Sequence, residues 1–92
     1  MAIKLEKILS VTAQEYVGPN VNVREQYELK GIHFSELTCN PNKIKGAVQN
    51  FAEQVPDNTE AVVSYQNNTS AAGRVNKLYY IQITGTALVP KK

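Results

Sequence analysis

The chain has 92 residues, with ten basic side chains, eight acidic ones, one histidine and one cysteine. This length predicts a single domain over residues 1–92 with a modest hydrophobic core. The lone cysteine excludes a disulfide within the chain, and one His with one Cys falls short of the usual four ligands of a structural zinc site. A net charge of +2 is too small to indicate a nucleic-acid-binding protein.

Signals for a membrane or for export are lacking in this sequence. No apolar run approaches the roughly 20 residues of a membrane span, and Lys4, Glu6 and Lys7 interrupt the start of any signal peptide. We therefore expect a cytoplasmic protein with no membrane partner.

Alternating apolar and polar residues predict β-strands in the first third of the chain. Apolar side chains at odd positions predict a strand over residues 3–17, and Gly18-Pro19-Asn20 predicts a turn. A second strand is expected from Val21 onward, paired with the first as an antiparallel hairpin. Its apolar phase changes from odd to even positions after Gly31, so we expect a β-bulge there.

The clearest pattern predicts one amphipathic helix over residues 40–55. Asn40 is expected to be its N-cap and Pro41 its first residue, and Pro56 ends the pattern. Gly46 inside the helix indicates a close backbone contact unless it is incidental. The apolar face of this helix comprises Ile44, Ala47, Val48, Phe51, Ala52 and Val55.

Two more strands are expected after the helix. The third begins at Ala61, residues 67–73 are expected to form a polar hairpin tip, and a long fourth strand spans residues 75–89. The fourth strand is apolar on both faces, and one helix can cover only one of them, so we expect a homo-oligomer. One face carries Tyr79, Ile81, Ile83, Ala87 and Val89, and the other carries Leu78, Tyr80 and Leu88.

The predicted order is β–β–α–β–β, an α+β fold with an antiparallel sheet of about four strands packed against one α-helix. Besides this order of elements, three short segments of the sequence can be compared with known families. They are Glu15-Tyr16-Val17-Gly18, residues 58–63, and Gly85-Thr86-Ala87-Leu88-Val89. On these segments the chain resembles the small YbjQ-like proteins, known as a heavy-metal-binding domain, and more broadly the dodecin-subunit-like proteins.

The resemblance implies a dodecin-like subunit in a ring-shaped homo-oligomer, with a pentamer favoured. An archaeal selenium-binding protein type of this fold carries its chemistry on a lone cysteine, which implies a soft metal or a selenium species at Cys39. A dodecin-like flavin site is suggested at Gly73-Arg74-Val75, but the chain has no Trp to stack on a flavin. The cofactor is therefore left unknown.

Cys39 is the leading candidate for a ligand-binding and metal-binding residue. It directly precedes the predicted N-cap, so its sulfur is expected near the positive end of the helix dipole, which favours a thiolate. The positive charge of Lys43 is expected to stabilise the thiolate further. Such a thiolate can bind a soft metal, a selenium species or another thiol. The alternative is packing, because Cys39 and Ile44 occupy the two positions of a hydrophobic staple. His33 lies roughly 20 Å away along an extended chain, so we expect a surface histidine rather than a second ligand.

Tyr65, Tyr79 and Tyr80 are expected at an interface between subunits, where aromatic side chains are enriched, or in the core. The alternative is base stacking on single-stranded nucleic acid. Arg74 and Lys77 would then contact phosphates, although two basic residues make a thin phosphate track.

No catalytic constellation is visible. A single histidine gives no convincing Ser/His/Asp order, and the acidic residues are scattered over positions that a solvated surface explains. We expect a small non-enzymatic homo-oligomeric binding protein whose soft ligand is held by Cys39. A self-assembly module and a weak single-stranded nucleic-acid binder are the alternatives.

Overall fold

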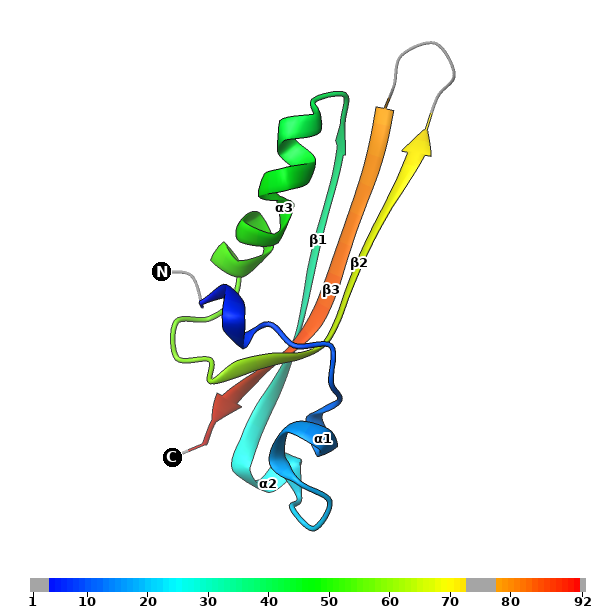
Figure 1. Ribbon diagram of the computed structural model, residues 1–92. Coiled ribbons are helices and arrows are strands. Elements are labelled where there is room, and N and C mark those ends of the chain that lie inside the picture. The colour runs from blue at the N-terminus through cyan, green and yellow to red at the C-terminus, as the bar shows by residue number, and fades with distance from the viewer. Residues whose placement is uncertain (1–3, 73–77, 92) are drawn as a thin grey trace.

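A three-stranded antiparallel sheet organises the protein in the computed structural model, which describes residues 4–72 and 78–91. The strands are β1 (Tyr27–Thr38), β2 (Ala61–Ala72) and β3 (Leu78–Pro90), in the spatial order β1–β3–β2 (Figure 1). The helices are the short 3₁₀-helix η1 (Leu5–Lys7) and the α-helices α1 (Ala13–Val17), α2 (Val23–Gln26) and α3 (Pro41–Glu53). The α+β class is confirmed, but the described residues form three strands rather than four.

The predicted N-terminal strand is wrong. Residues 5–7 and 13–17 are helical, and α1 begins with a capping box that competes with the strand pattern. The Glu15 N–H donates to Thr12 Oγ1 at 3.2 Å, and the Thr12 N–H donates to Glu15 Oε2 at 2.8 Å. Only a short stretch between η1 and α1 runs beside β2, where the Leu9 N–H donates to the Val62 carbonyl at 2.8 Å. The predicted N-terminal hairpin is therefore absent from the described part of the chain.

The predicted bulge at Gly31 is also wrong. β1 pairs with β3 without a register shift, from Tyr27 opposite Pro90 to Thr38 opposite Tyr79. The buried side of β1 nevertheless changes near Gly31, as its sequence pattern indicates. The change arises because different elements contact the two ends of the sheet: α1 and α2 lie at one end, and α3 lies along the other (Figure 1).

The bulge lies in β2 instead. Val63 pairs with Thr86 and Gln66 pairs with Thr84, so Ser64 and Tyr65 together stand opposite the single residue Gly85. Ser64 takes up the extra length with a φ of 57°. Through this bulge the Tyr65 ring reaches the core, where it meets Phe51 edge-on with ring centroids 5.9 Å apart.

The predicted helix is confirmed as α3, with bounds two residues shorter at its C-terminal end. Asn40 is its N-cap, since the Asn42 N–H donates to Asn40 Oδ1 at 2.9 Å, and Pro41 is the first helical residue. The apolar face of α3 packs on one face of the sheet and closes the main core. The fully or nearly fully buried members of this core are Ala47, Phe51, Val55, Val62, Ile81, Ile83 and Ala87.

The opposite face of the sheet is covered only at the end near α1 and α2, which we call the proximal half (residues 27–31, 61–63 and 85–90). Leu29, Leu88 and Ala61 lie opposite one another on this face, and Leu88 and Ala61 are fully buried. Here α1 contacts β2 and α2 contacts β1. The fourth predicted strand was rightly expected to be apolar on both faces, but the chain's own N-terminal segment covers Leu88. A second copy is therefore not needed at this end.

Candidate functional surface

Cys39 lies in the bend between β1 and α3. The Asn40 N–H donates to the side-chain oxygen Thr38 Oγ1 at 3.0 Å, and the Lys43 N–H donates to the Asn40 carbonyl at 3.0 Å, so local hydrogen bonds hold the bend. The Cys39 thiol is free and exposed, and the Lys43 side chain is exposed as well. A buried hydrophobic staple between Cys39 and Ile44 is therefore not formed, and the thiol is accessible to a ligand.

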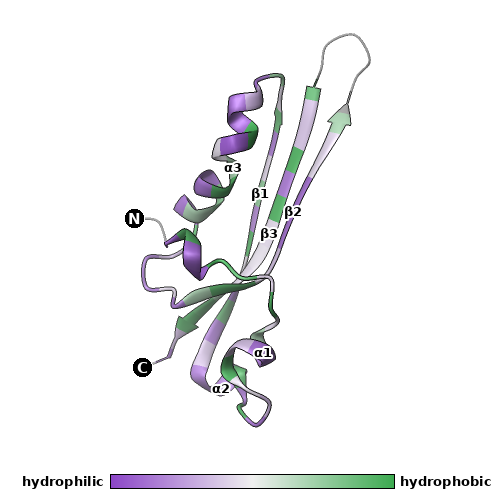
Figure 2. Ribbon diagram, viewed as in Figure 1, coloured by the Kyte–Doolittle hydropathy of each residue, from purple (hydrophilic) through white to green (hydrophobic). Residues whose placement is uncertain are grey.

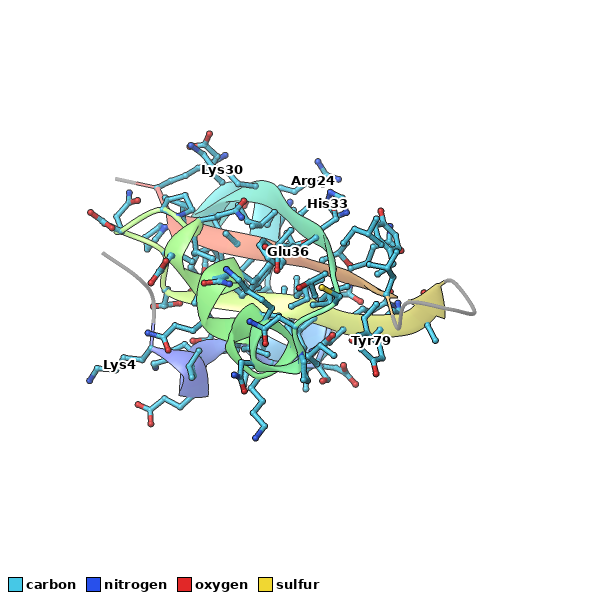
Figure 3. All side chains as sticks on the ribbon, turned by 90° about the horizontal axis from the view of Figure 1, so that it is seen from above. Lys4, Arg24, Lys30, His33, Glu36 and Tyr79 are labelled. Atoms are coloured by element: carbon cyan, nitrogen blue, oxygen red, sulfur yellow. The ribbon has the colours of Figure 1, made fainter. Side chains whose placement is uncertain are left out.

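The described residues form no metal-binding cluster around this thiol. Within residues 4–72 and 78–91, no three His, Cys, Asp or Glu side chains are grouped closely enough to hold a metal ion. His33 is exposed, as expected, and lies at the periphery of the molecule in the view of Figure 3. Among the described residues, Cys39 is thus the one thiol that a subunit offers to a soft metal.

The three tyrosines of the predicted interface do not share one surface. Tyr65 packs against Phe51 in the core. Tyr79 is half-buried on the same face as α3, because it stands opposite Thr38, whereas Tyr80 is exposed on the other face. A stacking platform made of all three rings is therefore not formed. Arg74 and Lys77, together with the suggested flavin segment Gly73-Arg74-Val75, lie outside the described residues.

The rest of the sheet, which we call the distal half (residues 32–38, 66–72 and 78–84), has one open face. Residues directly opposite each other in an antiparallel pair lie on the same face. On the face turned away from α3, three cross-strand rows of nine side chains are exposed, and none of them is Asp, Glu, Lys or Arg. The rows are His33–Thr84–Gln66, Ser35–Gln82–Asn68 and Leu37–Tyr80–Ser70.

The last row of the open face is partly apolar. Leu37 is 59% exposed and Tyr80 is 38% exposed, and the two stand directly opposite each other across β1 and β3. Leu78, two residues from Tyr80, is half-buried on the same face. Exposed apolar side chains that lie singly need no explanation, but a neighbouring pair at the end of an uncovered sheet marks a candidate contact surface.

The outer strand of the distal half is even less covered. Residues 66–71 of β2 are exposed at every position, on both faces of the sheet. Helix α3 contacts β1 and β3 but lies away from this part of β2 (Figure 1). Figure 2 shows that the proximal end of β2 is strongly hydrophobic, whereas its distal half is hydrophilic beyond the bulge and then pale towards the end of the strand. The predicted hairpin tip at residues 67–73 is thus mostly strand, which runs to Ala72.

The shape of the molecule reflects this incomplete cover. The protein measures 52 × 26 × 18 Å and has a radius of gyration of 15.0 Å, against about 12 Å for a compact chain of this length. Its accessible surface is 6268 Å², against about 5,300 Å² for a compact monomer of this mass. The chain thus exposes more surface than a compact fold of its size.

A shallow depression of about 290 Å³ at the other end of the molecule is lined by Gln14, Glu15, Gly18 and Pro19. It contains one carboxylate and one amide, with no thiol, imidazole or cation among these four residues. Such a lining offers no convergent set of polar groups for a small ligand.

The chain shows no similarity that would assign it to a family. Comparison with protein-family models, with curated proteins and with solved structures gives no match. Among the described residues, no helix is both long enough and apolar enough to cross a bilayer. The candidate surface therefore has to be interpreted from its own geometry.

Sequence reasoning identified Cys39 and Tyr80 as exposed candidates but missed the open face as a unit. Two signals could have indicated it. Thr12 and Glu15 have the spacing of a capping box, which places a helix where a strand was expected. Residues 66–72 contain no charge and no proline, which is unusual for an exposed outer strand.

Proposed function

We propose that this protein is a non-enzymatic interaction module that functions by self-association through the distal half of its sheet. The observation that carries this proposal is the uncovered state of that half. Its open face presents nine exposed, formally uncharged side chains, and its outer strand is exposed on both faces. A small chain with a modest core gains stability when a second copy covers such a surface.

The chemistry of the open face suits association better than catalysis. Its amides and hydroxyls both donate and accept hydrogen bonds, and Leu37 and Tyr80 supply an apolar contact. No Asp, Glu, Lys or Arg has to be removed from water when this face is covered, so the large cost of burying such a charge is avoided. We place the module in the cytoplasm, where the lone exposed thiol of Cys39 stays reduced.

Sedimentation velocity of the purified chain under reducing conditions tests the proposal. We expect the mass of two or more subunits, with a monomer fraction that grows on dilution. The reducing agent excludes a dimer made only by a Cys39–Cys39 disulfide. The same measurement separates a dimer from the pentameric ring that the sequence resemblance implies. A single-chain mass at every concentration contradicts self-association.

A second candidate function is the capture of a soft metal or a selenium species by Cys39, which the exposure of its thiol favours. Because the described residues of one subunit offer a single thiol and no cluster of metal ligands, we expect stable metal binding to use donors from more than one copy. Incubation with selenite or Cd²⁺, followed by mass spectrometry, tests this candidate. We expect an adduct with the native chain and none with Cys39→Ser, and Lys43→Gln should weaken uptake if the cation assists. Equal uptake by native chain and Cys39→Ser contradicts it.

A further inference from the structure

The distal edge of β2 is a row of backbone groups without a protein partner. In the described part of the chain, β2 is an outer strand, and the N-terminal segment pairs with it only around residues 62–65. Beyond the bulge, residues 66–71 have exposed side chains on both faces, and no backbone hydrogen bond joins their outer side to another described segment. Such an edge is a template for another strand.

The two edges of the sheet differ in how they are protected. β1 carries the exposed side chains of Glu28 and Lys30, and charged side chains on an edge strand discourage pairing with other chains. Residues 66–72 of β2 read Gln-Asn-Asn-Thr-Ser-Ala-Ala, without a charge or a proline. The distal edge of β2 is therefore the unprotected edge of this sheet.

We propose that this edge pairs with the same edge of a second copy, in an antiparallel β2–β2 contact around a two-fold axis. The inference rests on the proposed self-association and specifies its partner and its geometry. Full overlap of residues 66–72 with themselves puts the axis at the middle residue, Thr69. The two sheets then join into one six-stranded sheet.

A second copy fits this edge better than an extended peptide of another protein. The segment has no charge to attract a charged partner, whereas its amides and hydroxyls complement an identical set, since each group both donates and accepts. Thr69 meets its own counterpart, and Thr–Thr pairs are favourable neighbours across antiparallel strands. A two-fold axis also makes such a contact self-complementary and closed.

Disulfide trapping tests the geometry. In a Cys39→Ser background, single cysteines are introduced at Asn68, Thr69 or Ser70, and Ser35→Cys on β1 serves as the matched control, because Ser35 is exposed in the same cross-strand row as Asn68. Opposed residues in antiparallel strands have Cα atoms about 4.5–5.5 Å apart, within the range of a disulfide. We expect rapid cross-linking at one or more of the β2 positions and little at Ser35.

A charge at the axis gives a second measurement that does not depend on oxidation. Thr69→Lys places two ammonium groups opposite each other in the dimer, so we expect the dissociation constant to rise about tenfold or more. Ser35→Lys makes the same charge change on the open face of β1 and should leave the dissociation constant within about twofold. Both positions are exposed, so the folded chain tolerates either lysine.

The outcomes separate this inference from the proposed function. If the chain associates but is dissociated by Leu37→Lys, while the β2 cysteines stay unlinked, the open faces pack together and the edge pairing is overturned. Efficient linkage between Thr69→Cys and Ser35→Cys in a mixture of the two variants would mean β1-to-β2 pairing, as in a ring, and would also overturn it. If the chain remains monomeric, both the proposed edge pairing and the proposed self-association are contradicted.

Discussion

Gly85 and Val62 lie so close that the chain has no room for a side chain at Gly85. A Cβ at that position would stand 2.6 Å from Val62 Cγ1 and 3.2 Å from Phe51 Cζ. Gly85 also faces the bulge of β2, where Ser64 and Tyr65 stand opposite it. The glycine therefore allows β2, β3 and the Phe51 ring to meet at the centre of the core.

Gly85→Ala should lower the free energy of unfolding by about 1–3 kcal/mol, the usual cost of overpacking a tight core. The valine side chain has little rotational freedom in a strand and cannot move aside freely. Urea denaturation measures the change. Val62→Ala removes the closer contact, so the double variant should lose less stability than the sum of the two single variants. Simple additivity would contradict a direct clash between these positions.

Gly46→Ala should have the opposite effect. Gly46 lies inside α3, and a Cβ there meets no atom within 4 Å. Of the two explanations open from the sequence, the close backbone contact is therefore wrong. Alanine restricts the unfolded chain and favours a helix by about 0.5–1 kcal/mol. The midpoint of thermal unfolding should rise, and a lower midpoint would show that α3 contacts something at this position.

Local signals predicted α3 well because all of its determinants lie within its own segment. Asn40 and Pro41 start it, and its apolar spacing selects the buried face. The same reasoning predicted the two faces of β3, where Ile81 and Ile83 are buried and Tyr80 is exposed. A short-range pattern can be interpreted without knowing which element packs against the segment.

Features that depend on distant partners were not predicted. Gly31 was expected to form a bulge because its strand changes phase, yet the change comes from α2 and α3 contacting opposite ends of the sheet. The actual bulge, at Ser64, follows from a close approach between β2 and Gly85 that no local pattern reveals. The open face was missed for the same reason, since its rows combine residues from three separate strands.

Glu36 was expected on a solvated surface, but one of its carboxylate oxygens is shielded from solvent. Glu36 stands opposite Ile81 on the face that α3 covers and lies near the centre of the view in Figure 3. Its Oε2 has no hydrogen-bond partner among the described residues. A shielded acceptor without a partner costs stability.

Replacement of Glu36 by an apolar residue of similar length should therefore stabilise the fold. We expect Glu36→Met to raise the free energy of unfolding by about 1 kcal/mol, as measured in urea at neutral pH. Glu28→Met, at an exposed position in the proximal half of β1, is the matched control and should change stability by less than about 0.5 kcal/mol. Loss of stability in Glu36→Met alone would mean that this carboxylate has a favourable partner in solution.

Tyr27 ties the start of β1 to the segment before β2. Its hydroxyl donates a hydrogen bond to Glu60 Oε2 across 33 positions of sequence. That hydrogen bond, together with partial desolvation and the negative charge of Glu60, raises the pKa of Tyr27 from 10.0 to about 12. The folded protein thus holds the Tyr27 proton more tightly than the unfolded chain does.

A raised pKa stabilises the fold while the phenol is protonated in both states. The contribution of this pair is therefore complete below pH 10, and it is lost as the pH rises from 10 to about 12. We expect Tyr27→Phe to cost about 1 kcal/mol at neutral pH and the difference from the native chain to vanish towards pH 12. Urea denaturation of the native chain and of Tyr27→Phe across this pH range measures the difference in their free energies of unfolding. The effects of other titrating groups are common to both chains and cancel in that difference.

Spectrophotometric titration of tyrosinate checks the same pair without unfolding the protein. The native chain should show a component near pH 12 that Tyr27→Phe removes. Glu60→Gln removes the negative charge but keeps a hydrogen-bond acceptor, so the pKa of Tyr27 should fall back towards 10. If Glu60→Gln leaves the late component in place, burial rather than the carboxylate sets this pKa, and the link between β1 and the approach to β2 is weaker than the geometry indicates.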